Sequence, residues 1–289
     1  LIPKPVDTRV LLHVAPAVAK AAIDSGVARR QINIETYLEE VEKILGPTKK
    51  IIREIRNHIK GASNRLGRKP KIVIPHGTDE RMIKASAQVQ SNNDVQLILL
   101  GNKERIIKKA KSLGITDLES GLEIRDPESD QYSDEFANQL FNNRKRKGIS
   151  KTVAEGYIRR NNFFAAMMVH EGQADGMVSG LVEPYKESLK APLEIIGVRE
   201  GIPLSGIKIL VFKSKLIFLS DCTINKSPNS NELAEIAIAT TKFARYFTNE
   251  QIRVALLSYS NFGSNRSSET KIVKDAVEIL NNKDVDFIF

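Results

Sequence analysis

Residue types suited to binding an anion gather in a serine-rich segment near the end of the sequence. Residues 258–267 read SYSNFGSNRS and follow an apolar run that ends at Leu257. Hydroxyl groups, a flexible glycine and the free N–H groups of a following helix suit a phosphate. The alternative is that the hydroxyls only cap that helix. The candidate ligand-binding residues of this segment are Ser258, Tyr259, Ser260, Gly263 and Ser264.

A second candidate segment is Asp175–Gly180, which reads DGMVSG. Its two glycines flank a short apolar stretch, which indicates tight turns and close approach of the backbone to a neighbour or a ligand. Ser179 and Gly180 are therefore candidate ligand-binding residues. The alternative is an ordinary strand with glycines at its ends.

A third candidate segment carries four consecutive cations, Arg144–Lys147, followed by Gly148. Guanidinium and ammonium groups bind phosphates. Cations also gather at solvated helix ends, where they favour the helix dipole. The residue types alone leave both interpretations open.

The single cysteine, Cys222, would serve as a nucleophile only with a base beside it. No histidine lies near it in the sequence, so we predict a buried, inert thiol. The four histidines, His13, His58, His76 and His170, show no metal-ligand spacing, and we predict no metal site. Neither a Walker A motif nor a G-x-G-x-x-G motif occurs.

Composition narrows the class of protein. The 289 residues are 41% hydrophobic and 27% charged, which predicts a folded chain of one or two domains. No apolar run is long enough to span a membrane and no secretory signal is visible, so we expect a cytoplasmic protein without a membrane partner. The net charge is +9, but eight Lys or Arg against one Glu lie within residues 49–70. This concentration favours a basic linker over a nucleic-acid partner.

Hydrophobic periodicity predicts strands alternating with helices after a helical start. A helix capped by Asp7 or Thr8 and ended by Gly26 comes first, followed by two helices within residues 35–60 and a polar linker over Gly61–Gly67. Strands are predicted over residues 71–74, 95–100, 122–124, 207–212, 216–219, 253–259 and 285–289. This alternation predicts an α/β fold whose largely parallel sheet is covered on both faces.

The motifs together resemble the phosphate acetyltransferase (phosphotransacetylase) family. The resemblance lies in residues 71–81 (KIVIPHGTDER), 175–180, 221–242 and 254–264. Residues 2–28 separately look like the end of the catalytic part of bacterial malic enzymes. Together they resemble the C-terminal portion of a hybrid malic enzyme, in which a phosphotransacetylase-like domain follows the catalytic part.

The resemblance implies a three-layer α/β/α fold of the isocitrate-dehydrogenase-like kind, in two lobes with a cleft. A helical segment is expected to precede these lobes. The resemblance implies that residues 1–34 are the end of a malic enzyme catalytic part and that residues 35–68 are a helical basic linker. It implies an incomplete first lobe over residues 69–200 and a truncated second lobe over residues 201–289.

The resemblance also assigns site residues and shows departures. Arg144 matches the arginine of the family's Leu-Arg-Lys-x-Lys-Gly segment, and Lys190 stands in place of the arginine of Thr-(Leu/Val)-Arg-Pro. Glu183 replaces the family's histidine after Val-Ser-Gly. The family's catalytic Ser-Arg-Gly…Asp segment has no counterpart before Phe289, so we expect no catalytic residue in this chain.

The function implied is an acetyl-CoA-binding regulatory and oligomerisation domain. Coenzyme A or acetyl-CoA is the expected ligand, and self-association into a homodimer or a higher oligomer is expected. The parent enzyme would convert malate to pyruvate by oxidative decarboxylation, using NAD(P) and a divalent metal held outside this chain. The alternatives are an active phosphate acetyltransferase, which moves acetyl between coenzyme A and phosphate, and a purely structural interaction domain.

Overall fold

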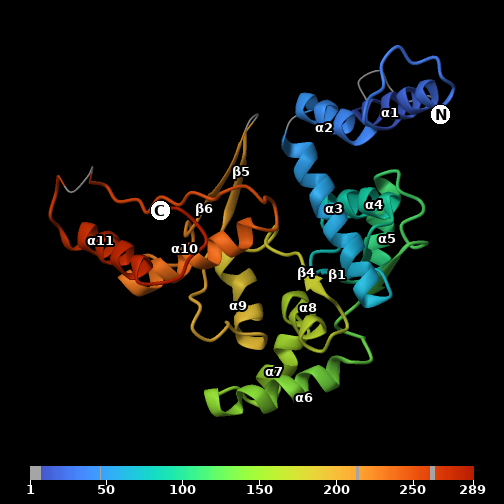
Figure 1. Ribbon diagram of the computed structural model, residues 1–289. Coiled ribbons are helices and arrows are strands. Elements are labelled where there is room, and N and C mark those ends of the chain that lie inside the picture. Colours follow the sequence, from blue (N-terminus) through green and yellow to red (C-terminus); the bar gives the residue numbers. More distant parts are fainter. Residues whose placement is uncertain (1–7, 46, 213–214, 261–263) are drawn as a thin grey trace. The chain divides into compact units, whose positions relative to one another are not determined.

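The computed structural model describes residues 8–45, 47–212, 215–260 and 264–289 (Figure 1). The chain forms two compact units, one made of residues 1–55 with 199–289 and the other of residues 56–198. We call them the first and the second unit. Within the described ranges, none of the helices combines the length and apolar character needed to cross a membrane.

The second unit contains a four-stranded parallel sheet in the order β3-β2-β1-β4. The strands are β1 (Lys71–Ile74), β2 (Gln96–Leu100), β3 (Leu122–Arg125) and β4 (Gly176–Met177). In this sheet Ile72 pairs with Leu97 of β2 on one side and with Gly176 of β4 on the other. The predicted parallel α/β arrangement is therefore confirmed.

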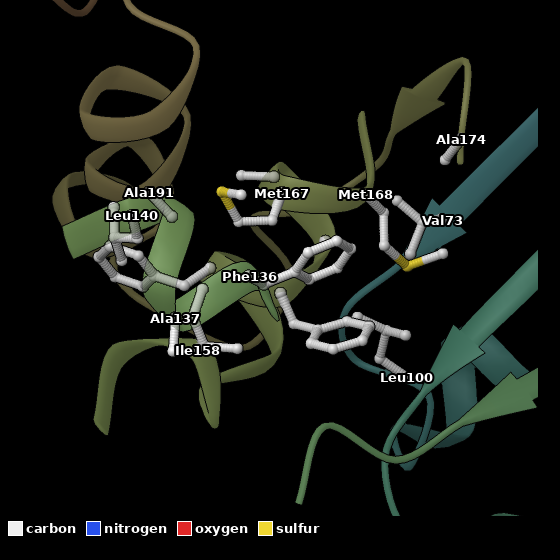
Figure 2. Packing of buried hydrophobic residues seen from close by; sticks show 14 of the residues in the cluster. Val73, Leu100, Phe136, Ala137, Leu140, Ile158, Met167, Met168, Ala174 and Ala191 are labelled. Atoms are coloured by element: carbon white, nitrogen blue, oxygen red, sulfur yellow. The ribbon is translucent and has the colours of Figure 1, made fainter. Parts of the chain in front are cut away.

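Helices cover both faces of this sheet because the strand side chains alternate in direction. Val73, Ile98 and Leu100 belong to a core cluster with helices α6 (Ser133–Arg144), α7 (Lys151–Ile158) and α8 (Asn161–His170). Figure 2 shows Met168 of that cluster beside the strand side chain Val73, with Met167 farther from the strands, toward Ala191.

The opposite face of the sheet is covered by two other helices. Ile74, Leu97 and Leu99 pack against Ile83 of α4 (Glu80–Asn92) and Ile106 of α5 (Lys103–Ser112). The three-layer α/β/α fold predicted from the sequence is thereby confirmed. The last helix of this unit is α9 (Tyr185–Ile195).

The predicted polar linker over Gly61–Gly67 is wrong in its local structure. Helix α3 (Pro47–Leu66) runs through it and ends at Gly67, whose φ of +64° suits glycine. Between the two glycines stand Ala62 to Leu66, none of which breaks a helix. A single internal glycine costs about 1 kcal/mol relative to alanine, which a continuous helix tolerates.

The first unit combines helices with an antiparallel hairpin. Its elements are α1 (Thr8–Asp24), α2 (Ile34–Leu45), β5 (Lys208–Val211), β6 (Leu216–Leu219), α10 (Ser230–Ala244) and α11 (Ser268–Asn281). Ala234 and Ala237 of α10 pack against Leu280 of α11 and Phe287. The helix predicted after Asp7 or Thr8 and the two hairpin strands are confirmed.

Two segments of the first unit that were predicted to be strands do not pair along their length with a neighbouring strand in the described residues. In the part of the chain that the structure describes, residues 253–259 and 285–289 share one isolated parallel bridge, between Arg253 and Ile288. The Val254 N–H donates to the Ile288 carbonyl at 2.8 Å. Val254, Leu256 and Val285 pack against the α10–α11 core, so the apolar pattern there reflects burial against helices.

The Asp221 carboxylate stabilises the turn that follows the β5–β6 hairpin. Its carboxylate accepts hydrogen bonds from the backbone N–H groups of Gly206, Thr223, Ile224 and Asn225, at 2.6–3.1 Å. Partial burial raises the pKa of Asp221, but these backbone donors outweigh it and lower the pKa to about 2. The ionised carboxylate therefore joins Gly206 to the turn at residues 221–225.

This arrangement predicts how acid acts on the first unit. A carboxyl whose folded pKa is depressed adds stability above its unfolded pKa of 3.8, and that stability is lost as the pH falls through about 2. Asp221→Asn should lower the free energy of unfolding at neutral pH. It should also make that free energy fall less steeply as the pH is lowered from 3.8 to about 2. Denaturant unfolding at a series of pH values measures both. Asp284→Asn, at an exposed carboxylate of the same unit, should change neither.

Candidate functional site

The sheet of the second unit has a topological switch point between β1 and β4. The chain leaves β1 to form β2 and β3 on one side, whereas β4 pairs with β1 on the other side. Loops that leave neighbouring strands in opposite directions open a crevice at their carboxyl ends, where open α/β sheets bind ligands. Here the loop after β1 begins at Pro75-His76 and the loop after β4 contains Ser179 and Glu183.

Four side chains meet at this switch point, and we call them the switch-point cluster: His76, Asn162, Ser179 and Glu183. The Ser179 hydroxyl donates to Asn162 Oδ1 at 2.7 Å, and its oxygen lies 3.4 Å from His76 Nε2. Asn162 Nδ2 donates to Glu183 Oε2 at 2.5 Å. His76 and Asn162 are buried, whereas Glu183 is exposed.

His76 has a lowered pKa, because burial disfavours its charged form. The nearby carboxylates of Glu183 and Asp79 act in the opposite direction and only partly offset the burial. The loop around His76 also lies close against β2, since a Cβ on Gly77 would meet the Leu100 carbonyl oxygen at 2.7 Å. Asp79 caps α4 by accepting from the Arg81 N–H.

Two polar residues of the DGMVSG segment have different roles: Ser179 belongs to the switch-point cluster, whereas Asp175 holds the first residues of β4 and β1 together. Asp175 accepts from both terminal nitrogens of Arg68 and from the Lys71 backbone N–H. These bonds fix the start of β4 beside the start of β1. Gly176 and Met177 form β4, and Gly180 has a φ of +104° in the turn that follows Ser179.

Lys190 lies on α9 and contacts one tyrosine of α7. Its Nζ donates to the Tyr157 hydroxyl at 3.1 Å and lies 4.9 Å from the centroid of that ring. The hydrogen bond to Tyr157 raises the pKa of Lys190, and the carboxylates of Glu194 and Glu187 add to this. The ammonium group therefore stays charged at neutral pH.

Arg144 also contacts α9, from the end of α6. One terminal nitrogen donates to the Leu193 carbonyl at 3.5 Å. Among the residues that the structure describes, Arg144 Nε and Ser188 Oγ are buried without a hydrogen-bond partner. Polar atoms of this kind suit a bound anion or water. Lys145–Lys147 instead form an exposed 3₁₀ turn, as the solvated helix end requires.

The serine-rich segment belongs to the first unit, and its described hydroxyls form hydrogen bonds within the segment. Ser258 Oγ donates to the Ser260 carbonyl at 3.2 Å, and Ser260 Oγ lies 3.2 Å from Ser264 Oγ. The Tyr259 hydroxyl donates to Ser267 Oγ at 2.8 Å, and Ser267 caps α11. Gly263 lies outside the described residues. That these residues join Ser179, Arg144 and Lys190 in one ligand site stays a prediction.

The prediction of a buried thiol at Cys222 is wrong, because this cysteine is exposed. Its neighbour Asp221 turns the chain through backbone hydrogen bonds, and these hold residue 222 at the surface. Across the described ranges, no group of three or more His, Cys, Asp or Glu side chains is arranged to hold a metal ion.

Sequence reasoning did not find His76 and Asn162 as site residues. His76 directly follows the first strand of a parallel sheet, a position that favours function. Asn162 stands at the polar start of a helix that is otherwise apolar, NNFFAAMMVH. Both signals were present, but only the strand order brings the two residues to Ser179.

A parallel sheet covered on both faces, with polar side chains at its switch point, places the chain among the open α/β proteins, a class that binds ligands at the carboxyl ends of the strands. The family follows from comparison. Residues 51–289 match the family described as "Phosphate acetyl/butaryl transferase", and the chain belongs to this family.

Relatives of two kinds are similar to the chain. NADP-dependent malic enzyme from Escherichia coli is 32% identical over 288 residues, which are 98% of this chain but 37% of that enzyme. Phosphate acetyltransferase from Bacillus subtilis is 36% identical over 218 residues, 75% of this chain and 66% of that protein. The chain thus spans little more than a third of the malic enzymes that it matches.

Solved phosphotransacetylases share the fold. EutD phosphotransacetylase from Staphylococcus aureus has a TM-score of 0.70 and 28% identity, covering 82% of this chain and 69% of that one. A phosphotransacetylase from Streptococcus pyogenes has a TM-score of 0.67 and 31% identity, covering 76% of this chain and 68% of that one. The resemblance inferred from the motifs is confirmed for both the family and the fold.

The switch-point cluster predicts how the charge of Glu183 acts on His76. In the unchanged protein the His76 pKa should lie below its ordinary value of 6.5. Glu183→Gln removes an anion that favours the imidazolium form, so the His76 pKa should fall further. NMR titration of the imidazole ring protons measures it, with a His76 variant to assign the signal. Glu155→Gln, at an exposed carboxylate on α7, should leave this pKa unchanged; a rise after Glu183→Gln would contradict the arrangement.

Proposed function

We propose that this chain binds acetyl-CoA and regulates a malic enzyme, and that it also mediates self-association of that enzyme. Two findings support the proposal together. The chain is similar to NADP-dependent malic enzymes along 98% of its length, and residues 51–289 belong to a family of acyl transferases that act on phosphate. An acyl-CoA ligand carries phosphates, for which Lys190 on α9 and Arg144 at the end of α6 offer partners.

The observation that carries the proposal is the attachment of Lys190 to Tyr157. An ammonium group held on one phenol is a point charge, without the planar fork with which arginine grips a phosphate at two oxygens. Such a group attracts the phosphates of a nucleotide but does not clamp a reacting acyl phosphate. Arg144 Nε and Ser188 Oγ, buried and unpartnered among the described residues, offer further polar contacts near it.

Regulation requires that acetyl-CoA bind one state of the whole enzyme more tightly than another. The proposed enzyme oxidises and decarboxylates malate to pyruvate. NAD(P) and a divalent metal are assigned to its catalytic part, and no step is assigned to the residues of this chain. The role of the chain is to hold the ligand and to transmit its binding energy.

Calorimetric titration with acetyl-CoA tests the ligand and the role of Lys190. We expect saturable binding to the unchanged protein and about tenfold weaker binding after Lys190→Ala, which corresponds to about 1.4 kcal/mol. Lys186→Ala removes an exposed lysine from the same helix and is the matched control. Absence of binding, or equal losses in the two variants, would refute the proposal. Malate oxidation by the larger enzyme, with and without acetyl-CoA, tests the regulation.

The alternative is an active phosphate acetyltransferase, and the similarity to the Bacillus subtilis enzyme favours it. In that reaction a phosphate oxygen forms a bond to the acetyl carbon, the carbon–sulfur bond breaks, and coenzyme A leaves as a thiol after taking up a proton. Phosphate-dependent release of thiol from acetyl-CoA, followed with a thiol reagent, would support this alternative if Arg144→Ala abolished it. We expect no such release.

A further inference from the structure

The switch-point cluster already contains an anion. Asn162 is the second residue of α8, and the first N–H groups of a helix lack intrahelical acceptors and favour negative charge. A ligand anion at this crevice would need the amide of Asn162, the hydroxyl of Ser179 and the imidazole of His76. The Glu183 carboxylate accepts the hydrogen bond from that amide instead.

We propose that Glu183 is a specificity-determining residue that excludes a second anion, such as inorganic phosphate, from the switch-point cluster. This inference deepens the proposed function, and it rests on it only in taking the second unit as a ligand-binding unit. The Glu183 carboxylate would explain how the switch-point cluster rejects small anions, although its neutral hydrogen-bond donors would suit any small oxyanion.

The hydrogen bonds show why the carboxylate excludes a competitor. Ser179 gives its only proton to Asn162 Oδ1, and Asn162 Nδ2 donates to Glu183. An incoming phosphate would therefore have to compete with Asn162 for the Ser179 proton and with Glu183 for the N–H that Asn162 donates. It would also approach the negative charge of Glu183, which repels a second anion.

The local backbone keeps the carboxylate in place. Glu183 precedes Pro184, which restricts it to extended conformations, and Pro184 itself stands at the start of α9 with a φ of −55°. The backbone of Glu183 therefore lies between the β4 loop and α9, and its carboxylate is positioned by the hydrogen bond from Asn162. Because it is exposed, it can still turn away into solvent. The exclusion is thus a competition between a tethered anion and a free one.

Titration with inorganic phosphate, followed by NMR of the backbone amides, tests this inference. We expect phosphate to perturb the signals of residues 76, 162 and 179 at least about tenfold more tightly after Glu183→Ala than in the unchanged protein. Glu155→Ala removes one exposed carboxylate from the same unit and controls for net charge. Equal affinity in Glu183→Ala and the unchanged protein, or an equal gain in Glu155→Ala, would overturn it.

A second variant checks that the phosphate occupies this cluster. Ser179→Ala in the Glu183→Ala background removes one donor and should reverse most of the gain in phosphate affinity. A gain that persists would place the phosphate elsewhere and overturn the inference. Amide spectra of each variant show whether the fold is retained, and Glu183→Gln provides a nearly isosteric substitute if Glu183→Ala does not fold.

The two proposals fail in different ways. If the unchanged protein does not bind acetyl-CoA but Glu183→Ala gains phosphate affinity, the proposed function fails and the role of Glu183 stands. If acetyl-CoA binds with the predicted dependence on Lys190 and phosphate affinity is the same with or without Glu183, the inference fails and the proposed function stands.

Discussion

The second unit depends on one buried amide. Asn162 is the second residue of α8, and the next six residues are all buried in the core, so its polar atoms must be satisfied where the helix meets the sheet edge. Ser179 and Glu183 supply those contacts, one to the amide oxygen and the other to the amide nitrogen. A buried amide left without partners costs about 1–3 kcal/mol. Satisfying it therefore ties the loop after β4 to α8 and places the charge of Glu183 beside His76.

Much of the fold could be predicted because local patterns and tertiary structure agree. The run ending at Leu100 forms a strand buried on both faces, as its unbroken apolar sequence indicated. The pattern at 253–259 was equally apolar, yet its side chains pack on α10 and its backbone makes one bridge. An apolar pattern reports burial, whereas a strand also requires a partner in register. The linker predicted over Gly61–Gly67 was wrong for a similar reason, since a single glycine such as Gly61 weakens a helix without ending it.

The candidate site was predictable only in part. Ser179 was found from its glycine-flanked segment, and Arg144 and Lys190 from the family resemblance. His76 and Asn162 were missed because they are separated from Ser179 by 103 and 17 residues, and only the order of β1 and β4 brings them together. Cys222 was misjudged because the usual burial of a free thiol gives way to the turn that Asp221 imposes.

The charges of the second unit suggest a division of labour between its two polar regions. Lys190 of α9 is held by the Tyr157 hydroxyl, and Arg144 at the end of α6 keeps a buried nitrogen unpartnered within the described chain, so positive charge remains available to a ligand. At the switch point, the carboxylate of Glu183 uses a donor that a small anion would need. A ligand with phosphates at some distance from a neutral end can satisfy the first region without approaching the second. A free phosphate gains only from the first. The arrangement therefore agrees with both proposals, an acetyl-CoA ligand held by the first region and a small anion kept from the second.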